Sequence, residues 1–241
     1  MTPFLSGRWA NVFVQAWAVD EALFRPYLLP GMVPDRWEGR AMVGLVALDL
    51  IDARVLGVRV PGKRRVPELS LRLYVCDGRR RGTRTIRQFV PRPMMTGMSR
   101  LAANEPTTTV PYRRTGEEHE ITCGGRAHRI AWTTVGEPGP APEAGFEDFL
   151  LNRPWMFGKH WSGMPLSLRV DHPRWRVWGD VRPRLDFDPK VLFGAPWQAL
   201  ETARPHGVVV AEGSPFEVHA LAGFVEGQRA VAREVREEAT V

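Results

Sequence analysis

The sequence predicts an α+β domain in which antiparallel β-strands predominate and a few helices lie at the periphery. Short stretches that alternate apolar and polar residues recur along the chain, and this period of two is typical of strands. Turns rich in glycine and proline separate these stretches. Because helical periodicity is confined to a few segments, an antiparallel sheet or a barrel is the expected architecture.

The first half of the chain supplies one short helix and three strands. Asp20 is a good helix-capping residue, so residues 20–25 predict a brief helix. The Asp77-Gly78 turn joins two alternating segments as a hairpin. The three strands are expected at residues 40–54, 67–76 and 82–90.

The second half alternates further strands with two helices. Residues 91–105 and 145–153 predict helices, although Pro93 and Gly97 weaken the first. Strands are expected at residues 107–113, 118–122, 127–135, 166–170, 175–181, 207–211 and 216–221. The proline-rich loop 136–142 is too weakly isolated to divide the chain, so we treat residues 1–241 as a single domain. Within it, the charged stretch 222–241 predicts a peripheral helix or tail.

The length of the chain and the features of its N-terminus limit the class of protein. The 241 residues are 44% hydrophobic, which is enough to bury a sizeable core. The longest apolar run, residues 41–50, is too short to cross a bilayer. The N-terminus lacks the apolar core of a signal peptide. We therefore expect a cytoplasmic protein that does not enter a membrane; a homo-oligomer is compatible with the sequence.

The basic charge points only weakly to nucleic acid. The formal net charge is +6 with a pI near 10, but only three of the 33 basic residues are lysines and the arginines are spread along the chain. Local clusters occur at residues 63–65 and 79–81, without an RNA- or DNA-binding signature. Nucleic-acid binding therefore ranks below the alternatives.

Sequence motifs for cofactors, metals and common nucleophiles are absent. The glycines form no nucleotide-binding pattern, and no HExxH, CxxC or GxSxG occurs. The six histidines show no ligand spacing, and Cys76 and Cys123 make no disulfide framework. We expect no cofactor and no metal.

One strand segment carries an unusual polar row. Four polar residues, Glu68, Ser70, Arg72 and Tyr74, alternate with Leu69, Leu71, Leu73 and Val75. The acid, hydroxyl, guanidinium and phenol therefore share one face of the strand. An arginine beside a glutamate can hold a substrate carboxylate. By periodicity alone, a solvated face explains the row somewhat better than a ligand site does.

A second candidate is the segment Asp171-His172-Pro173-Arg174-Trp175. A histidine titrates near neutrality and can orient a substrate or move a proton. The alternative is a strand-connecting turn in which His172 caps backbone groups and Trp175 packs. The chain is also rich in aromatic residues, with nine tryptophans; these can wall a small-molecule pocket or simply fill a barrel.

Taken together, several segments resemble the uncharacterised YqjF-like family, the domain of unknown function 2071, within the acetoacetate decarboxylase-like superfamily. The resemblance covers roughly residues 10–220 and rests on residues 18–30, 39–46, 66–75, 146–153 and 172–175. Pro-Glu-Leu-x-x-Arg-x-Tyr-Val is its most specific block, although the family usually has asparagine where this chain has Ser70. The resemblance implies antiparallel strands curved around a central cavity, with the polar row pointing inward.

The same resemblance implies that the best-known chemistry of the superfamily is missing. That chemistry uses a lysine that forms a Schiff base with a β-keto acid. The matching segment here is Phe89-Val-Pro-Arg-Pro, which places Arg92 about where the lysine would stand. A guanidinium stays protonated and is a poor nucleophile. Lys159 is the remaining lysine candidate, and nothing in the family pattern supports it.

Three functions follow as hypotheses. The first is a cavity for a small organic acid, with lyase, dehydratase or isomerase chemistry. The second is a non-catalytic protein that binds a small ligand in the same cavity, and the third is a basic nucleic-acid-binding module. For the first two, the expected ligand-binding residues are Glu68, Ser70, Arg72, Tyr74, Arg92, His172 and Trp175.

Overall fold

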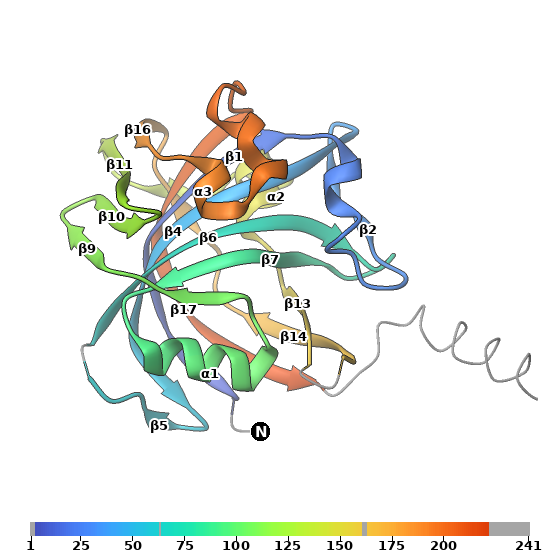
Figure 1. Cartoon of the computed structure of the whole chain (residues 1–241), viewed down its shortest axis with the longest axis vertical. Coiled ribbons are helices and arrows are strands. Elements are labelled where there is room, and N and C mark those ends of the chain that lie inside the picture. Colours follow the sequence, from blue (N-terminus) through green and yellow to red (C-terminus); the bar gives the residue numbers. More distant parts are fainter. Residues whose placement is uncertain (1–2, 63, 161–162, 222–241) are drawn as a thin grey trace, which may run out of the picture.

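The computed structural model describes residues 3–62, 64–160 and 163–221 (Figure 1). Within them, seven strands close into a barrel, in which each strand pairs with the next and β17 pairs back with β1. All neighbours are antiparallel except β7 and β13. In barrel order the strands are β1 (Leu5–Ala18), β4 (Arg40–Val55), β6 (Arg65–Cys76), β7 (Arg81–Val90), β13 (Trp155–Lys159), β14 (Pro165–Asp171) and β17 (Gly207–Leu221).

A smaller antiparallel sheet lies outside the barrel, together with short helices (Figure 1). Its strands, in spatial order, are β16 (Asp180–Asp186), β11 (Arg126–Val135), β10 (Glu118–Cys123) and β9 (Tyr112–Thr115). The helices are η1 (Glu21–Phe24), α1 (Pro93–Ala103), α2 (Phe146–Leu151), α3 (Pro189–Phe193) and η2 (Ala195–Glu201). The short strands are β2 (Val33–Pro34), β3 (Arg36–Trp37), β5 (Val58–Arg59), β8 (Thr107–Thr109), β12 (Gly139–Pro140) and β15 (Arg176–Val177).

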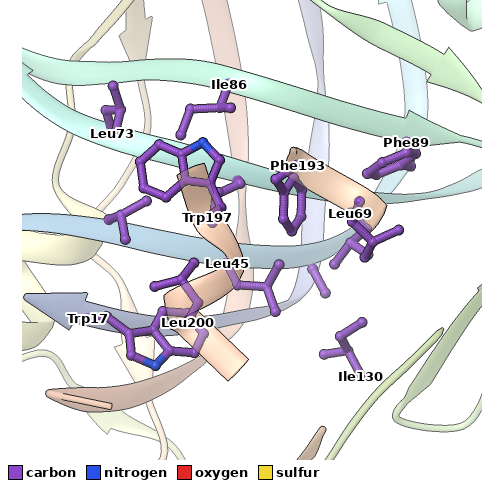
Figure 2. Close-up of a cluster of buried hydrophobic side chains, with 14 of the residues drawn as sticks. Trp17, Leu45, Leu69, Leu73, Ile86, Phe89, Ile130, Phe193, Trp197 and Leu200 are labelled. Atoms are coloured by element: carbon purple, nitrogen blue, oxygen red, sulfur yellow. The ribbon is translucent and has the colours of Figure 1, made fainter. Parts of the chain in front are cut away.

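The central barrel strands β4 and β6 are buried on both faces, and the molecule has two apolar layers. The outer layer packs between the barrel wall, the small sheet and the α3–η2 segment. Figure 2 shows part of it, with Leu69 and Leu73 of β6 facing Phe193 and Trp197. The inner layer fills the barrel and includes Val14, Val46 and Tyr74. Because successive side chains of a strand point to opposite faces, the polar row on β6 faces into the barrel.

The fold confirms the expected antiparallel, barrel-like α+β architecture and revises several element boundaries. Residues 175–181 were expected to form one strand, but β15 and β16 belong to different sheets, separated at the exposed Gly179. The two strands expected at 207–211 and 216–221 are one, β17. Gly213 lets β17 continue, since its φ of 116° brings its backbone against Trp9 and Ala10 of β1 more closely than a Cβ would allow.

Of the remaining expectations, the helices are confirmed and some strands were missed. The helices expected at 91–105 and 145–153 are present, each a few residues shorter at its ends, and residues 20–25 contain a 3₁₀ helix. The strands β1, β13 and most of β16 were not expected. The segment 222–241, expected as a helix or tail, lies outside the described residues. Of the helices in the described part of the chain, none has the length and apolarity needed to cross a membrane.

Candidate ligand site in the barrel

Three residues of the polar row form one hydrogen-bonded group on β6. Arg72 Nη2 donates to Glu68 Oε1 at 2.6 Å, and Arg72 Nε donates to Ser70 Oγ at 3.0 Å. The Ser70 hydroxyl lies 3.3 Å from the same Glu68 oxygen. The side chains of Arg72 and Glu68 are only 17% and 14% exposed, so the pair is well shielded from water. Neighbours on its own strand therefore orient Arg72.

Tyr74, the fourth member of the row, is a buried neutral hydroxyl. Burial raises the pKa of Tyr74 to about 12, against a smaller opposing effect of the nearby Arg153 and Arg72 cations. Its ring reaches across to β4, where a Cβ on Gly44 would lie 2.8 Å from the hydroxyl oxygen. A glycine at position 44 therefore provides the space that the phenol occupies.

A pocket opens inside the barrel beside this row. Its cavity volume is about 60 Å³, which is room for roughly four water molecules or a few heavy atoms of a ligand. Aliphatic side chains of β1 and β4 form one wall, namely Val12, Val14, Val46 and Leu48. The polar lining includes Arg72, Tyr74, Thr83, Arg153 and His172, and Trp9 and Trp175 add aromatic rings. An apolar wall with a few convergent polar groups is typical of small-molecule sites.

Arg153 is a pocket residue that the sequence analysis missed. It follows α2, is only 6% exposed, and its guanidinium carbon lies 4.0 Å from the centre of the Phe149 ring and 4.9 Å from that of Tyr74. Nη1 donates to Asp35, whereas Nε and Nη2 are buried and bond no residue in the described ranges. Burial lowers the pKa of Arg153, and Asp35 opposes this effect.

Glu105 is a second buried charge that the sequence analysis missed. It lies between α1 and β8, is 8% exposed, and its carboxyl group hydrogen-bonds with Thr85. Burial raises the pKa of Glu105 to about 7, although the nearby Arg84 and Arg72 cations oppose the shift. Glu105 does not line the pocket. No sequence signal distinguishes it from an exposed glutamate at the end of a helix.

The structure gathers most of the residues that the sequence predicted. Arg72, Tyr74, His172 and Trp175 line the pocket, and Glu68 and Ser70 contact Arg72. Arg92 does not line it. Its guanidinium lies against Gly62, whose φ of 104° and missing side chain make room for it, and its carbonyl accepts the first hydrogen bonds of α1.

The two residues of the 171–175 segment have different roles in the packing. Trp175 is buried and donates Nε1–H to the Leu151 carbonyl at 3.0 Å. His172 is half-buried, lies 4.9 Å from the Trp175 ring between ring centres, and donates Nδ1–H to the Pro173 carbonyl at 2.8 Å. That bond directs the proton of a neutral imidazole to Nδ1 and makes Nε2 the acceptor.

In the described part of the chain, no lysine lines the pocket. Lys159 lies exposed at the end of β13. Among these residues, too, no group of three histidine, cysteine or acidic side chains is arranged to hold a metal ion. What the pocket residues offer is donors for an anion, namely two guanidinium groups and the Tyr74 and Thr83 hydroxyls.

Comparison with solved structures shows that the chain has the acetoacetate decarboxylase-like fold. Acetoacetate decarboxylase from Legionella pneumophila superimposes with a TM-score of 0.61 at 12% identity, over 91% of this chain and 87% of the other. The enduracididine biosynthesis enzyme MppR, complexed with pyruvate, gives 0.58 at 13% identity over 91% and 90%. An acetoacetate decarboxylase-like enzyme from Sphingomonas wittichii RW1 gives 0.57 at 13% identity over 92% and 94%.

The chain belongs to the DUF2071 family, described as uncharacterized conserved proteins, whose model matches residues 6–215. None of the curated proteins matches it significantly in sequence. The structural likenesses lie far below 25% identity, so they establish the fold and no shared activity.

Proposed function

We propose that this chain binds a small organic acid in the barrel pocket. The observation that carries the proposal is Arg153, a buried guanidinium at the pocket whose Nε and Nη2 bond no described residue. Leaving donors of a buried cation unpaired is costly. A ligand carboxylate would supply the missing acceptors, and a guanidinium fork matches its geometry.

The charges around the pocket favour a monoanion. The carboxylate of Glu68 compensates the positive charge of Arg72. Asp35 is shared between Arg153 and Arg81, and it lies 2.8 Å from the latter. One negative charge therefore faces two positive ones at the Arg153 end. The neutral Tyr74 hydroxyl can donate to a second oxygen of the ligand, such as a keto or hydroxyl group.

The small volume and the aliphatic wall limit the ligand to a short acid with an apolar tail. A 60 Å³ cavity excludes acids with long chains unless the barrel rearranges. A structural neighbour, MppR, has been captured with pyruvate. That ligand is a small oxo acid, and this supports the same ligand class for the present pocket.

A more specific form of this proposal is that the chain also catalyses a reaction of the bound acid. Arg72, Arg153 and Tyr74 could stabilise negative charge on a ligand oxygen during lyase, dehydratase or isomerase chemistry. His172 also lines the pocket and offers Nε2 as a proton acceptor, since its Nδ1–H donates to the Pro173 carbonyl. A Schiff-base route is not proposed, because it needs a lysine at the pocket. The second candidate, binding without turnover, needs only the donors described above.

The test is a thermal-shift titration with short oxo and hydroxy acids, pyruvate and 2-oxobutanoate among them. The wild-type melting temperature should rise with at least one acid, whereas Arg153→Met and Arg72→Met should lose the shift. Arg36→Met is the matched control, because Arg36 forms an exposed ion pair with Glu21 away from the pocket. If no short acid shifts the wild type, the proposal fails. If an acid does shift the wild type, one-dimensional NMR of that acid over time separates turnover from simple binding.

A further inference from the structure

The hairpin that joins β4 to β5 carries an apolar tip. Figure 1 shows β5 at the same end of the barrel as α1 and opposite α3. Val55 pairs with Val58 across a two-residue turn, and the side chains of Leu56 and Val58 are 63% and 72% exposed. Single exposed apolar side chains are common on protein surfaces, so their exposure alone does not indicate a function.

The backbone at the tip is one that a leucine adopts at a cost. The φ angles of Leu56 and Gly57 are 50° and 81°, and positive φ at both central residues is the pattern of a type I′ hairpin turn. Asparagine, aspartate and glycine favour the first of these positions, whereas a bulky apolar side chain is strained there. Leu56 therefore weakens the turn without adding to the core, which points to a contact outside the chain.

Arginines surround the base of this tip. Arg54 and Arg59 are direct cross-strand neighbours on β4 and β5, and like charges in such a pair repel each other. Arg54 Nη1 also donates to the Gly57 carbonyl at 3.3 Å, which holds its guanidinium beside the turn. We call the exposed arginines of this region the arginine collar; they are Arg54, Arg59, Arg64 and Arg65.

Nearby carboxylates compensate only part of the charge of the collar. Asp52 lies 2.8 Å from Arg64 and 3.5 Å from Arg59. Asp49 lies 3.9 Å from Arg65 but is also paired with Arg114. Of the described residues 52–65, four are arginines and Asp52 is the one acid. This end of the barrel therefore has a positive surface around its apolar tip.

The hairpin is fixed to the body of the protein. The Val60 amide donates to the Ala53 carbonyl at 2.8 Å, and the Leu56 amide donates to the Phe4 carbonyl at 3.0 Å. Ala53 belongs to the inner apolar layer together with Met95 of α1, and Val60 packs against that layer. The tip is therefore held in place by backbone hydrogen bonds and by packing before any partner binds.

We infer that the tip of this hairpin docks on the surface of an anionic lipid bilayer. Leu56 and Val58 enter the boundary between headgroups and acyl chains, and the arginine collar binds lipid phosphates. A bilayer explains both features together, because the apolar side chains leave water and phosphates lie between the like-charged arginines. The contact is superficial and requires no segment that spans the membrane. It does not depend on the proposed acid pocket.

Vesicles of two compositions test this inference on the full chain. In co-sedimentation, vesicles of phosphatidylcholine with about a third phosphatidylglycerol should bind the chain at least about tenfold more tightly than phosphatidylcholine alone. High salt should weaken this binding, since it screens the arginine collar. Equal binding to the two vesicles, or no binding to the anionic ones, would overturn the inference.

Leu56→Asn separates a bilayer from a soluble polyanion. Asparagine suits a positive φ, so this variant should melt at the same temperature as the wild type or higher. Its affinity for the anionic vesicles should fall about tenfold, because the apolar contact is lost. A nucleic acid would bind the arginines through its phosphates. Unchanged vesicle affinity in Leu56→Asn, with binding to duplex DNA as tight as to vesicles, would assign the collar to nucleic acid instead.

Arg54→Gln tests the contribution of the collar. It removes one member of the like-charged pair, so the melting temperature should not fall, whereas affinity for the anionic vesicles should drop about fivefold. Arg182→Gln on β16 and Val135→Thr on β11 are matched controls, because both residues are exposed on the small sheet. The two controls should bind vesicles as the wild type does. Equal losses in Arg54→Gln and Arg182→Gln would contradict a site at the hairpin.

Discussion

The Tyr74 hydroxyl occupies the space that a side chain at Gly44 would fill. The two residues come from adjacent strands, β6 and β4, and a Cβ at position 44 would lie 2.8 Å from the hydroxyl oxygen and 3.3 Å from Val14. The position of the phenol in the pocket therefore depends on a glycine that no polar motif would single out.

The first prediction concerns this pair. Gly44→Ala should destabilise the protein by about 1–3 kcal/mol, since the barrel interior is close-packed and the new methyl group must displace Tyr74. In Gly44→Ala/Tyr74→Phe the loss should be smaller, because the closest atom is gone. Urea denaturation measures both. Additive losses in the double variant would contradict the proposed contact.

The second prediction is an asymmetry in the ion pairs around Asp35. Asp35→Asn leaves the buried Arg153 cation without its negative partner and should cost about 3–5 kcal/mol. Arg153→Met should cost nearer 1 kcal/mol, because Asp35 keeps Arg81. Denaturant unfolding of both variants at one pH checks the order. Equal losses would mean that Asp35 does not compensate Arg153.

The third prediction is a pH dependence caused by Glu105. The folded-state pKa of Glu105 is raised from 4.5 to about 7, so between these values the folded chain holds a proton that the unfolded chain has released. Its contribution to stability is therefore lost as the pH rises through this window, by about 3 kcal/mol in total. Glu105→Gln should flatten this slope in urea unfolding measured from pH 5 to 8. An unchanged slope would contradict the burial of a protonated carboxyl.

The fourth prediction has the opposite sign and concerns His119. Burial and the Arg114 cation hold the pKa of His119 well below 6.5, and its Nδ1 lies 2.6 Å from the Tyr112 hydroxyl. Below pH 6.5 the imidazole of His119 is protonated in the unfolded chain but stays neutral in the folded chain. The contribution of the neutral His119 to stability is therefore lost as the pH falls below 6.5. His119→Gln should remove the acid-side loss. Proton NMR of the imidazole provides a direct check, because the signal should not titrate near pH 6.5.

The fifth prediction tests the missing Schiff base. Borohydride reduction in the presence of pyruvate should leave the mass of the protein unchanged, since no lysine among the described residues lines the pocket. A reduced adduct mapped to Lys159 would show that this exposed residue reaches a keto acid, and it would reverse the conclusion drawn from the pocket.

The antiparallel strands and the alternation of the polar row could be predicted from sequence, because a strand's period of two is local. Glu68 to Tyr74 alternate with leucines, but which face turns inward was predicted only from the resemblance to a family. Arg153 and Glu105 could not be found in this way. Each follows a helix and looks like an exposed charge, and its burial depends on the strands and loops that pack over it.

The same limit explains the element that was misjudged near the C-terminus. Gly213-Ser214-Pro215 has the composition of a turn, yet it continues β17, since Gly213 adopts a positive φ against Trp9. Arg92 shows the converse. The family resemblance implies that it takes part in the ligand site, but at the start of α1 its side chain lies against Gly62. In both cases the deciding contact comes from a distant segment.

The pairing of β1 with β17 has a consequence for how the protein is made. Leu5 lies opposite Val218, and Ala16 lies opposite Gly207, so the seam of the barrel joins segments about two hundred residues apart. During synthesis, the edge of β1 that pairs with β17 stays unpaired until β17 has been made. Unpaired strand edges promote aggregation. Contacts this distant also slow folding. Closure of the seam should therefore be a late step, completed only when nearly the whole barrel has left the exit tunnel.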